Sequence, residues 1–193
     1  MCIRDRDIVI SLLLLLVSSP IIILTAFAIK IDSEGPIFFK QERLGQNGKP
    51  FRVLKFRSMI NNAEKHTGPV WSQKDDPRVT RMGKFVRRVR IDELPQMYNV
   101  LKGEMSLVGP RPERAFFVEK LSLEIPYYKR RLKVRPGVTG WAQIKHKYDE
   151  TIEDVRIKLK YDLFYIENMS LRMDFKILLR TVFVVLFGKG HYD

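Results

Sequence analysis

The chain has little of the side-chain chemistry that builds disulfides or zinc sites. It has one cysteine, Cys2, among 193 residues, which excludes a disulfide framework within the chain and a cysteine metal site. Its three histidines lie far apart, at His66, His146 and His191, without the spacing of metal ligands, so we expect no structural zinc. The chain also has no internal repeats and no low-complexity tract.

Acidic residues are in the minority. Lys and Arg number 35 against 22 for Asp and Glu, which gives a formal net charge of +13. This excess predicts an anionic partner, and nucleic acid, an anionic lipid surface and phosphorylated substrates all satisfy it. A chain of this length holds one modest domain and an anchor, with enough residues for a real core.

Charge is absent altogether from the stretch between Ile8 and Ile29. A helix of this length reaches across a bilayer core of about 30 Å. Three structures fit: a spanning helix, a re-entrant hairpin that enters and leaves on the same side, and a cleaved signal peptide with Ala26-Phe27-Ala28 as its cleavage site. The apolar stretch is long for a signal peptide.

The centre of this stretch, Ser18-Ser19-Pro20, favours the hairpin. Pro20 lacks an N–H and its ring presses on the carbonyl of Leu16, while the two serines can return hydrogen bonds to the freed carbonyls. Each half is too short to cross the bilayer alone. A spanning helix that is kinked at Pro20 is compatible with the same residues, so both structures stay open. Positive residues flank both ends and predict that both are cytoplasmic: Arg4, Arg6, Lys30, Lys40 and Arg43.

Gly35-Pro36 ends the membrane segment. It divides the chain into an anchor, residues 1–34, and a cytoplasmic membrane-associated domain, residues 35–193. The start, residues 1–6, has the character of an assembly artefact or a truncation, so no interpretation rests on it. A longer parent protein with further membrane helices upstream is compatible with this start.

The sequence of residues 35–193 predicts an α+β fold that is mostly helical. Two short strands, 37–39 and 51–56, with the turn 45–48 between them, predict a small β-hairpin. Residues 66–79 and 135–140 are rich in turn formers and predict loops. Helices are predicted over residues 58–64, 80–89, 92–102, 113–124, 126–133, 151–167 and 170–187.

Two of these helices carry further signals. Thr151 and Asp154 have the spacing of a capping box, which marks a helix start. Residues 178–187 are mostly apolar and follow a charged segment, so the last helix fits an amphipathic helix in the lipid interface. A buried core helix fits the same pattern.

Asp92-Glu93-Leu94-Pro95 sets two adjacent carboxylates beside a predicted helix start in a basic chain. Negative groups among cations indicate a site for a metal ion, a phosphate ester or both, where a carboxylate can attack phosphorus. The alternative is that Asp92 is a helix N-cap and Glu93 lies in an acidic first turn. The neighbouring cations and the stiff turn downstream are Lys84, Arg87, Arg88, Arg90 and Gly109-Pro110-Arg111-Pro112.

Several ordered motifs resemble the bacterial sugar transferases, which are the monotopic phosphoglycosyl transferases. The Ser19-Pro20 break also resembles the re-entrant anchor of that family. The resemblance covers Asp7 to Gly188 and is specific, because the motifs are long and keep their order. They are Lys55-Phe56-Arg57-Ser58-Met59, residues 90–96, residues 99–106, Val108-Gly109-Pro110-Arg111-Pro112 and residues 135–143.

The resemblance implies a membrane-bound enzyme that moves a sugar-1-phosphate from a UDP-sugar to undecaprenyl phosphate and releases UMP. Pro112-Glu113-Arg114 and residues 148–151 look most like members that start exopolysaccharide synthesis. The resemblance also implies the bacterial inner membrane, with a catalytic domain on the cytoplasmic face, contacts with inner-membrane lipids and no nucleic-acid partner. A homodimer, the sugar and the glycan stay open.

The resemblance assigns roles to single residues. Asp92 would attack the β-phosphorus and form a covalent aspartyl-phosphosugar, while Mg2+ held by Asp92 and Glu93 would bridge the phosphates. The first N–H groups of the helix would help to hold phosphate oxygens. Asp174 fits an ion pair on its helix equally well. Candidate phosphate or nucleotide ligands at matching positions are Lys55, Arg87, Arg111, Arg135, Gln143 and Asp174.

One stretch departs from the family. After residues 141–143 many members have Val-Asn-Gly or Val-Asn-Tyr and often an arginine, where this chain has residues 144–148. Lys147 supplies a charge there, but a lysine cannot copy a bidentate guanidinium, so this stretch does not indicate the nucleotide or the sugar. Other basic residues are interpreted as a solvated or lipid-facing surface: Lys84, Arg88, Lys129, Arg130, Arg131 and Lys133.

Two other functions compete. A glycosyltransferase that releases UDP usually needs an Asp-x-Asp metal motif, and the chain has one only at Asp5-Arg6-Asp7, beside the membrane segment. A non-enzymatic basic membrane module fits the charge but explains neither Asp92-Glu93 nor the Gly-Pro-Arg-Pro turn. The released nucleotide distinguishes these functions: UMP indicates a phosphoglycosyl transferase, UDP a glycosyltransferase, and no turnover a non-enzymatic module.

Overall fold

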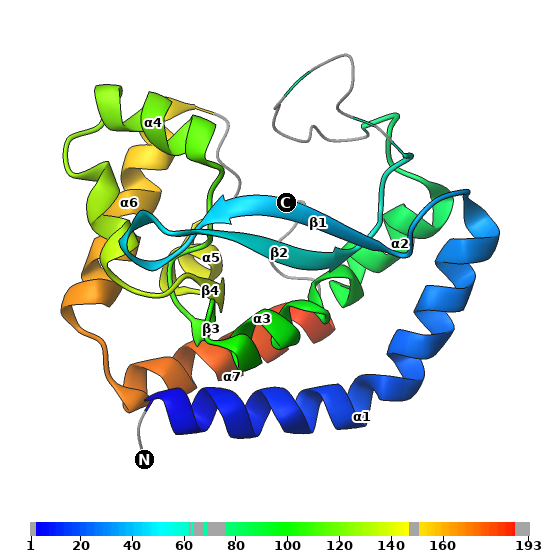
Figure 1. The fold of residues 1–193 in the computed structure, drawn as a ribbon. Helices are drawn as coiled ribbons and strands as arrows, with labels where there is room; N and C mark the ends of the chain where they lie inside the picture. The colour runs from blue at the N-terminus through cyan, green and yellow to red at the C-terminus, as the bar shows by residue number, and fades with distance from the viewer. Residues whose placement is uncertain (1–2, 62, 64–67, 69–75, 147–150, 188–193) are drawn as a thin grey trace.

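We describe a computed structural model of the chain, which covers residues 3–61, 63, 68, 76–146 and 151–187 (Figure 1). Helices dominate it, and two small sheets complete an α+β fold, as predicted. In chain order the elements are α1 Ile3–Asp32, β1 Phe38–Leu44, the 3-10 helix η1 Gln46–Gly48, β2 Pro50–Phe56, α2 Arg81–Arg88, the 3-10 helix η2 Ile91–Glu93, α3 Gln96–Lys102, β3 Ser106–Val108, α4 Ala115–Glu124, the 3-10 helix η3 Tyr128–Lys133, β4 Gly137–Thr139, α5 Trp141–Lys145, α6 Ile152–Glu167 and α7 Leu171–Phe187.

Helix α1 contains Pro20 in its interior and changes direction along its length (Figure 1). The Ser18 hydroxyl donates to the carbonyl of Leu14, and the Ser19 hydroxyl donates to the carbonyl of Leu16 at 2.8 Å. These are the compensating bonds that the sequence predicts around a proline in an apolar helix. Within the described residues α1 is the one helix long and apolar enough to cross a membrane.

Both ends of α1 are attached to the same folded body. Near its start Arg4 donates to the carbonyls of Val100 and Leu101, at 2.5 and 2.6 Å, at the end of α3. Beyond its end Arg57 donates to the carbonyls of Ser33 and Glu34, at 2.7 and 2.5 Å. The sequence suggests an assembly artefact or a truncated start at residues 1–6, yet Arg4 belongs to the packing.

Strands β1 and β2 pair antiparallel, from Phe38 opposite Phe56 to Leu44 opposite Pro50. The predicted hairpin is therefore confirmed. β1 is longer than predicted, because a strand of a two-stranded ribbon can carry charged residues on its exposed face and so shows little apolar pattern. Phe51, Val53 and Phe56 of β2 are buried.

Three helix predictions change in the structure. Residues 58–61 are not helical, because Met59 forms a β-bridge with Val79 and the carbonyl of Ser58 accepts from Thr80. The predicted helix 92–102 becomes α only from Gln96, and residues 128–133 form a 3-10 helix. The predicted loop 66–79 lies mostly outside the described residues, and the predicted loop 135–140 contains β4.

The sheet formed by β3 and β4 is not predicted by the sequence. The two strands are parallel, with Ser106 opposite Gly137 and Val108 opposite Thr139. Each strand is only three residues long, and the partners are far apart in the sequence, so neither shows a local strand pattern. This sheet places the segment after β3 beside the segment before β4, and the site depends on that placement.

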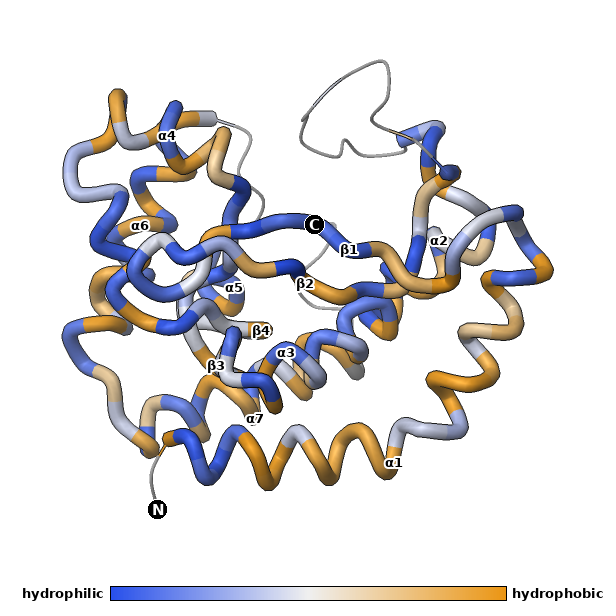
Figure 2. The backbone as a smooth tube through the Cα atoms, viewed as in Figure 1, coloured by the Kyte–Doolittle hydropathy of each residue, from blue (hydrophilic) through white to orange (hydrophobic). Residues whose placement is uncertain are grey.

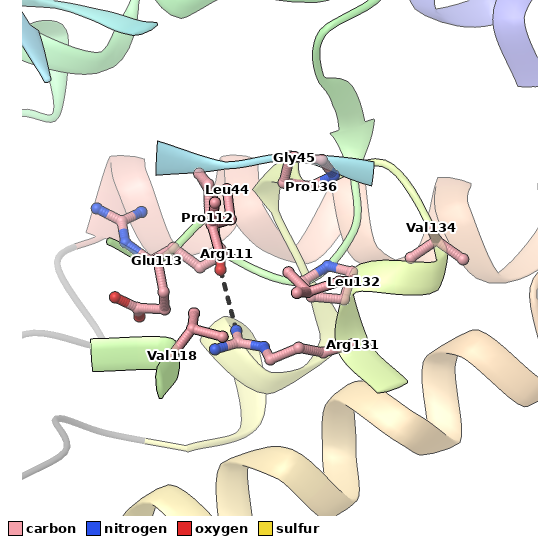
Figure 3. Close-up of a pocket in the computed structure, with 11 residues that line it drawn as sticks. Leu44, Gly45, Arg111, Pro112, Glu113, Val118, Arg131, Leu132, Val134 and Pro136 are labelled. Carbon is pink, nitrogen blue, oxygen red and sulfur yellow. Dashed lines mark hydrogen bonds between the residues drawn. The ribbon is translucent and has the colours of Figure 1, made fainter. Parts of the chain in front are cut away.

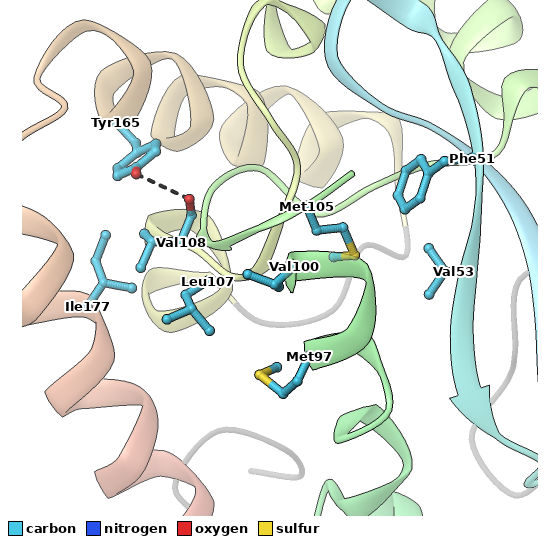
Figure 4. Close-up of a cluster of buried hydrophobic side chains, with 9 residues drawn as sticks. All are labelled: Phe51, Val53, Met97, Val100, Met105, Leu107, Val108, Tyr165 and Ile177. Carbon is cyan, nitrogen blue, oxygen red and sulfur yellow. Dashed lines mark hydrogen bonds between the residues drawn. The ribbon is translucent and has the colours of Figure 1, made fainter. Parts of the chain in front are cut away.

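Two apolar clusters form the core. One joins β2, α3, β3, α6 and α7, and complete burial of side chains of this kind contributes roughly 1.5–3 kcal/mol each (Figure 4). The other joins α4, η3 and α6. The first consists of Phe51, Val53, Met97, Val100, Met105, Leu107, Val108, Tyr165 and Ile177, and the second of Val118, Leu121, Ile125, Tyr128, Val155 and Leu159.

Helix α7 packs on the core, which is one of the two structures that its sequence allows; a position in the lipid interface stays a prediction. Ile177 is fully buried in the first cluster, whereas Leu179 and Val182 are 71% and 56% exposed. The helix therefore packs one face on the core and presents an apolar face outward. Hydrophobic segments also dominate the exposed length of α1, which lies with α7 in the lower part of the molecule in the view of Figure 2.

Candidate active site

The carboxylate pair lies on a tight turn between α2 and α3. Arg90 has a positive φ of 56°, a left-handed conformation that ends the preceding helix, and Ile91–Glu93 then form the 3-10 turn η2. The helix was predicted to begin at Asp92, with its first N–H groups directed at phosphate oxygens. The N–H groups of Glu93 and Leu94 instead donate to the carbonyls of Arg90 and Ile91, at 3.3 and 3.1 Å.

Glu93 is fixed by two cations from distant segments. Arg111 Nη2 donates to Glu93 Oε1 at 2.6 Å, and Lys55 Nζ donates to the same oxygen at 3.2 Å. Burial alone would raise the pKa of the Glu93 carboxyl, but the charges of Arg111 and Lys55 hold that pKa well below its ordinary value. Glu93 is therefore ionised across the physiological range.

Asp92 is in a different environment, although it is adjacent in sequence. No hydrogen bond or ion pair found in the described part of the chain involves its carboxylate. Burial, and then the negative charge of Glu93, raise the pKa of Asp92 to about 6, while Lys55, Arg111 and Arg87 act in the opposite direction. Of the two carboxylates, Asp92 is thus the one whose oxygens are not held by a cation.

Arg87 approaches the pair from α2. Its Nε donates to the hydroxyl of Ser58 at 2.8 Å, and its charge lowers the pKa of Asp92. Gly83 in the same helix lies against the main chain of Ser58, where an added Cβ would come within 2.0 Å of the Ser58 carbonyl oxygen. The absence of a side chain at Gly83 therefore lets α2 pack closely enough to bring Arg87 to the site.

Arg111 lies in the Pro-Arg-Pro turn after β3. Gly109 donates to the carbonyl of Thr139, and Gly137 donates to the carbonyl of Pro110, both at 2.9 Å. An added Cβ at Gly137 would come within 2.1 Å of the Gly109 nitrogen, so the two backbones touch here. The parallel β3–β4 pairing therefore fixes the position of this turn.

A small cavity lies behind the turn, lined by Arg111, Glu113 and Arg131 among others (Figure 3). Its volume is about 10 Å³, which is about the space for one water molecule. The cavity is too small for a sugar nucleotide.

Four of the predicted site residues come together, and three others do not join them by hydrogen bonds or ion pairs. Asp92, Glu93, Lys55 and Arg111 form the group around which Arg87 packs. Arg135 lies half-buried just before β4. Gln143 donates to the carbonyl of Val138 at 3.2 Å.

Asp174 lies in a separate buried cluster. It forms an ion pair with Arg6 of α1, and its Oδ1 accepts from the Tyr165 hydroxyl at 2.8 Å. Asp174 thus joins α1, α6 and α7, as a polar contact between helices and not within one helix. No hydrogen bond or ion pair of the described residues joins it to Asp92 or Glu93.

Sequence reasoning misses two residues of the site. Ser58 supports Arg87, and although it belongs to the motif 55–59, its position in the sequence gives no sign of that contact. Arg131 was interpreted as part of a solvated or lipid-facing surface, and this is wrong, because it is 4% exposed and donates to the main chain of Arg111. Within the run 129–131 the sequence offers no signal that distinguishes the buried arginine from its neighbours.

The oxygen ligands of the pair fit Mg2+. Mg2+ binds through one or two carboxylates together with substrate phosphates and waters. Asp92 and Glu93 supply two carboxylates, and no group of three or more acidic, histidine or cysteine side chains suited to a metal occurs in the described residues. The site thus suits an ion that is completed by a phosphorylated substrate, and not a metal enclosed by protein alone.

Comparison with known proteins shows the family to which the chain belongs. The profile of one family, described as bacterial sugar transferase, matches residues 1–188. The chain is 48% identical over 187 residues to the UDP-N-acetylgalactosamine-undecaprenyl-phosphate N-acetylgalactosaminephosphotransferase of Aeromonas hydrophila, covering 97% of this chain and 44% of that protein.

Two further relatives differ in how much of their length is matched. The UDP-glucose:undecaprenyl-phosphate glucose-1-phosphate transferase of Klebsiella pneumoniae is 44% identical over 193 residues, covering 98% of this chain and 41% of that protein. The exopolysaccharide production protein PSS of Rhizobium leguminosarum bv. phaseoli is 42% identical over 196 residues, covering 97% of this chain and 96% of that protein. The chain therefore spans less than half of the first two relatives and nearly all of the third.

Proposed function

Because this chain belongs to the bacterial sugar transferase family, we propose that it transfers a sugar-1-phosphate from a UDP-sugar to undecaprenyl phosphate. The names of the relatives support the reaction class, and the Rhizobium relative supports exopolysaccharide synthesis as the pathway that this step initiates. One structural observation carries the proposal. Lys55 and Arg111 both bind Glu93, and among the residues that the structure describes the carboxylate of Asp92 beside it has no ion-pair partner.

This asymmetry suits covalent catalysis by Asp92. A carboxylate oxygen of Asp92 attacks the β-phosphorus, a new O–P bond forms, and the bond from that phosphorus to the bridging oxygen breaks, so that UMP leaves with the electron pair. An oxygen of the lipid phosphate then attacks the same phosphorus and frees the carboxylate. The products are UMP and the undecaprenyl-diphosphate sugar.

Cations of the site make the approach of one anion to another possible. Lys55, Arg87 and Arg111 reach the pair from β2, α2 and the turn after β3. Fixed positive charges at the reacting phosphoryl group stabilise the transition state without reorganisation, since they are already in place. Asp92 and Glu93 are the residues that would hold Mg2+, and a bound Mg2+ would neutralise phosphate charge.

The attachment of α1 supports a re-entrant anchor. A spanning helix would place its ends on opposite sides of the bilayer, but Arg4 and Arg57 tie the two ends to one folded body. α1 and α7 both lie in the lower part of the molecule in the view of Figure 2, and both carry exposed apolar residues. We therefore place this side in the inner membrane and the carboxylate pair on the cytoplasmic face.

The nucleotide product tests this function. Purified protein with undecaprenyl phosphate, Mg2+ and a panel of UDP-sugars is expected to release UMP and to form a lipid-linked diphosphate sugar. Glu119→Gln, on the exposed side of α4, serves as an acidic control and retains activity, whereas Asp92→Asn loses it. Release of UDP, or the absence of turnover with every UDP-sugar, would contradict the proposal.

A further inference from the structure

The segment 110–113 is held at every one of its main-chain carbonyls. Pro110 and Pro112 have no N–H, so this segment depends on what its carbonyls accept. The four carbonyls accept from three parts of the fold, because two of the donors, Arg43 and Leu44, are neighbours in β1. The donors are Gly137 N to Pro110 O at 2.9 Å, Arg131 Nη2 to Arg111 O at 3.0 Å, Arg43 Nη1 to Pro112 O at 3.2 Å and Leu44 N to Glu113 O at 2.9 Å.

Arg131 is the most deeply buried of the side chains in this set. Its side chain is 3% exposed and forms an ion pair with Asp162, from Nη2 to Oδ2 at 2.9 Å. Its Nη1 donates to the Tyr128 hydroxyl at 2.6 Å. Figure 3 shows the guanidinium beneath the turn, directed at the carbonyl of Arg111. Substrate cannot reach a guanidinium that is buried and already engaged in this way.

We infer that Arg131, supported by Asp162, is a positioning residue that fixes the main chain of Arg111 so that the Arg111 side chain meets Glu93. The main chain and the side chain of Arg111 point to different partners, because its carbonyl accepts from Arg131 while its Nη2 donates to Glu93 at 2.6 Å. A hydrogen bond from a charged donor is stronger than a neutral one, so this contact anchors the turn better than an amide donor would.

The planar fork of arginine matters here. Arg131 reaches the Arg111 carbonyl, the Asp162 carboxylate and the Tyr128 hydroxyl with one rigid group. A lysine places one ammonium on a flexible stem and cannot hold all of these positions together. Arg131→Lys therefore keeps the buried charge opposite Asp162 while it weakens the hold on Arg111.

A double-mutant cycle tests this role, and its activity readout rests on the proposed function. With Arg111 present, Arg131→Lys is expected to lower kcat/KM about tenfold; in an Arg111→Ala background the same change is expected to lower it less than about twofold. Arg130→Lys, the same change at the exposed neighbouring position, is the matched control. It is expected to leave the melting temperature nearly unchanged and kcat/KM within about twofold.

An equal loss in both backgrounds would overturn the inference, because Arg131 would then act on the whole fold and not through Arg111. Hydrogen exchange provides a readout that needs no turnover. Arg131→Lys is expected to speed exchange in a peptide over residues 108–114 and to leave a peptide over β2 unchanged.

The two possible failures are distinguishable. Absence of sugar-phosphate transfer by the unmodified protein contradicts the proposed function, while the exchange experiment still decides the role of Arg131. Unchanged exchange over residues 108–114 in Arg131→Lys overturns the positioning role even if transfer is observed.

Discussion

Arg111 Nη2 lies 2.6 Å from Glu93 Oε1, so a cation held between two prolines is bound to one carboxylate of an adjacent pair and not to the other. The fold thus gives the two carboxylates different surroundings, although Asp92 and Glu93 are neighbours in sequence. Glu93 is a strongly acidic, fixed group, whereas the pKa of Asp92 is raised to about 6, first by burial and then by the charge of Glu93. Different environments give two like groups different roles.

Glu93→Gln is expected to lower kcat/KM by about 100-fold or more, since it removes the anion between Lys55 and Arg111 and one ligand suited to Mg2+. Lys55 and Arg111 then repel each other, and Asp92 becomes the main remaining counter-charge of Lys55, while Glu113 and Asp92 remain for Arg111. UMP release measures the effect, with Glu119→Gln as the control. A loss below about threefold would show that Glu93 does not organise the site.

Asp92→Asn is expected to stabilise the fold at pH 8 and to have little effect near pH 4. The pKa of Asp92 is raised in the folded state to about 6, so the folded protein binds this proton more tightly than the unfolded chain does. The associated stability is fully present below the unfolded pKa and is lost as pH rises through 6. In Asp92→Asn the new side chain carries no charge at any pH, so the folded state does not lose this stability as pH rises.

Melting temperatures of both proteins in detergent with a metal chelator, from pH 4 to pH 8, provide the measurement. The expected gain at pH 8 is on the order of 1–2 kcal/mol. A difference between the two proteins that does not change with pH would contradict the raised pKa.

Gly83→Ala is expected to reduce both stability and activity, because the new Cβ would come within 2.0 Å of the Ser58 carbonyl oxygen. Backbone cannot move aside as a flexible side chain does, so α2 must shift and carry Arg87 away from Ser58 and from the carboxylate pair. The cost of overpacking is about 1–3 kcal/mol. Lys84→Ala, on the exposed side of the same helix, is the control and is expected to be nearly neutral. Equal stability of the two variants would show that α2 does not need this close approach.

Labelling of introduced cysteines tests the anchor. In a Cys2→Ser background, Asp5→Cys and Glu34→Cys lie at exposed positions on either side of the uncharged stretch of α1. Both are expected to resist an impermeant thiol reagent in intact cells and to react after lysis, as two cytoplasmic sites do. Reaction of one of them in intact cells would replace the re-entrant helix with a spanning one.

Local patterns were sufficient where short-range chemistry decides the structure. Thr151 and Asp154 form the predicted capping box at the start of α6, since that motif lies within one turn. The turn around Asn47, with its positive φ of 57°, likewise closes the predicted β1–β2 hairpin. The structure of such segments can be predicted from their own residues.

Long-range contacts explain what the sequence could not show. The helix expected at 58–64 is replaced over 58–61, because the bridge from Met59 to Val79 satisfies backbone groups that a helix would otherwise use. Arg131 was assigned to a solvated surface because burial comes from α4 and α6, which lie elsewhere in the chain. The cations around Asp92-Glu93 were predicted as a group, but the binding of Lys55 and Arg111 to Glu93 alone is a property of the fold.

The covalent step is tested most directly with a UDP-sugar that carries radioactive phosphorus in its β-phosphate, incubated with the protein and Mg2+ without undecaprenyl phosphate. We predict that label becomes bound to the protein, that it maps to the peptide containing Asp92, and that it is released when undecaprenyl phosphate is added. UMP formed with lipid but without any bound label, or label that persists in Asp92→Asn, would contradict the account.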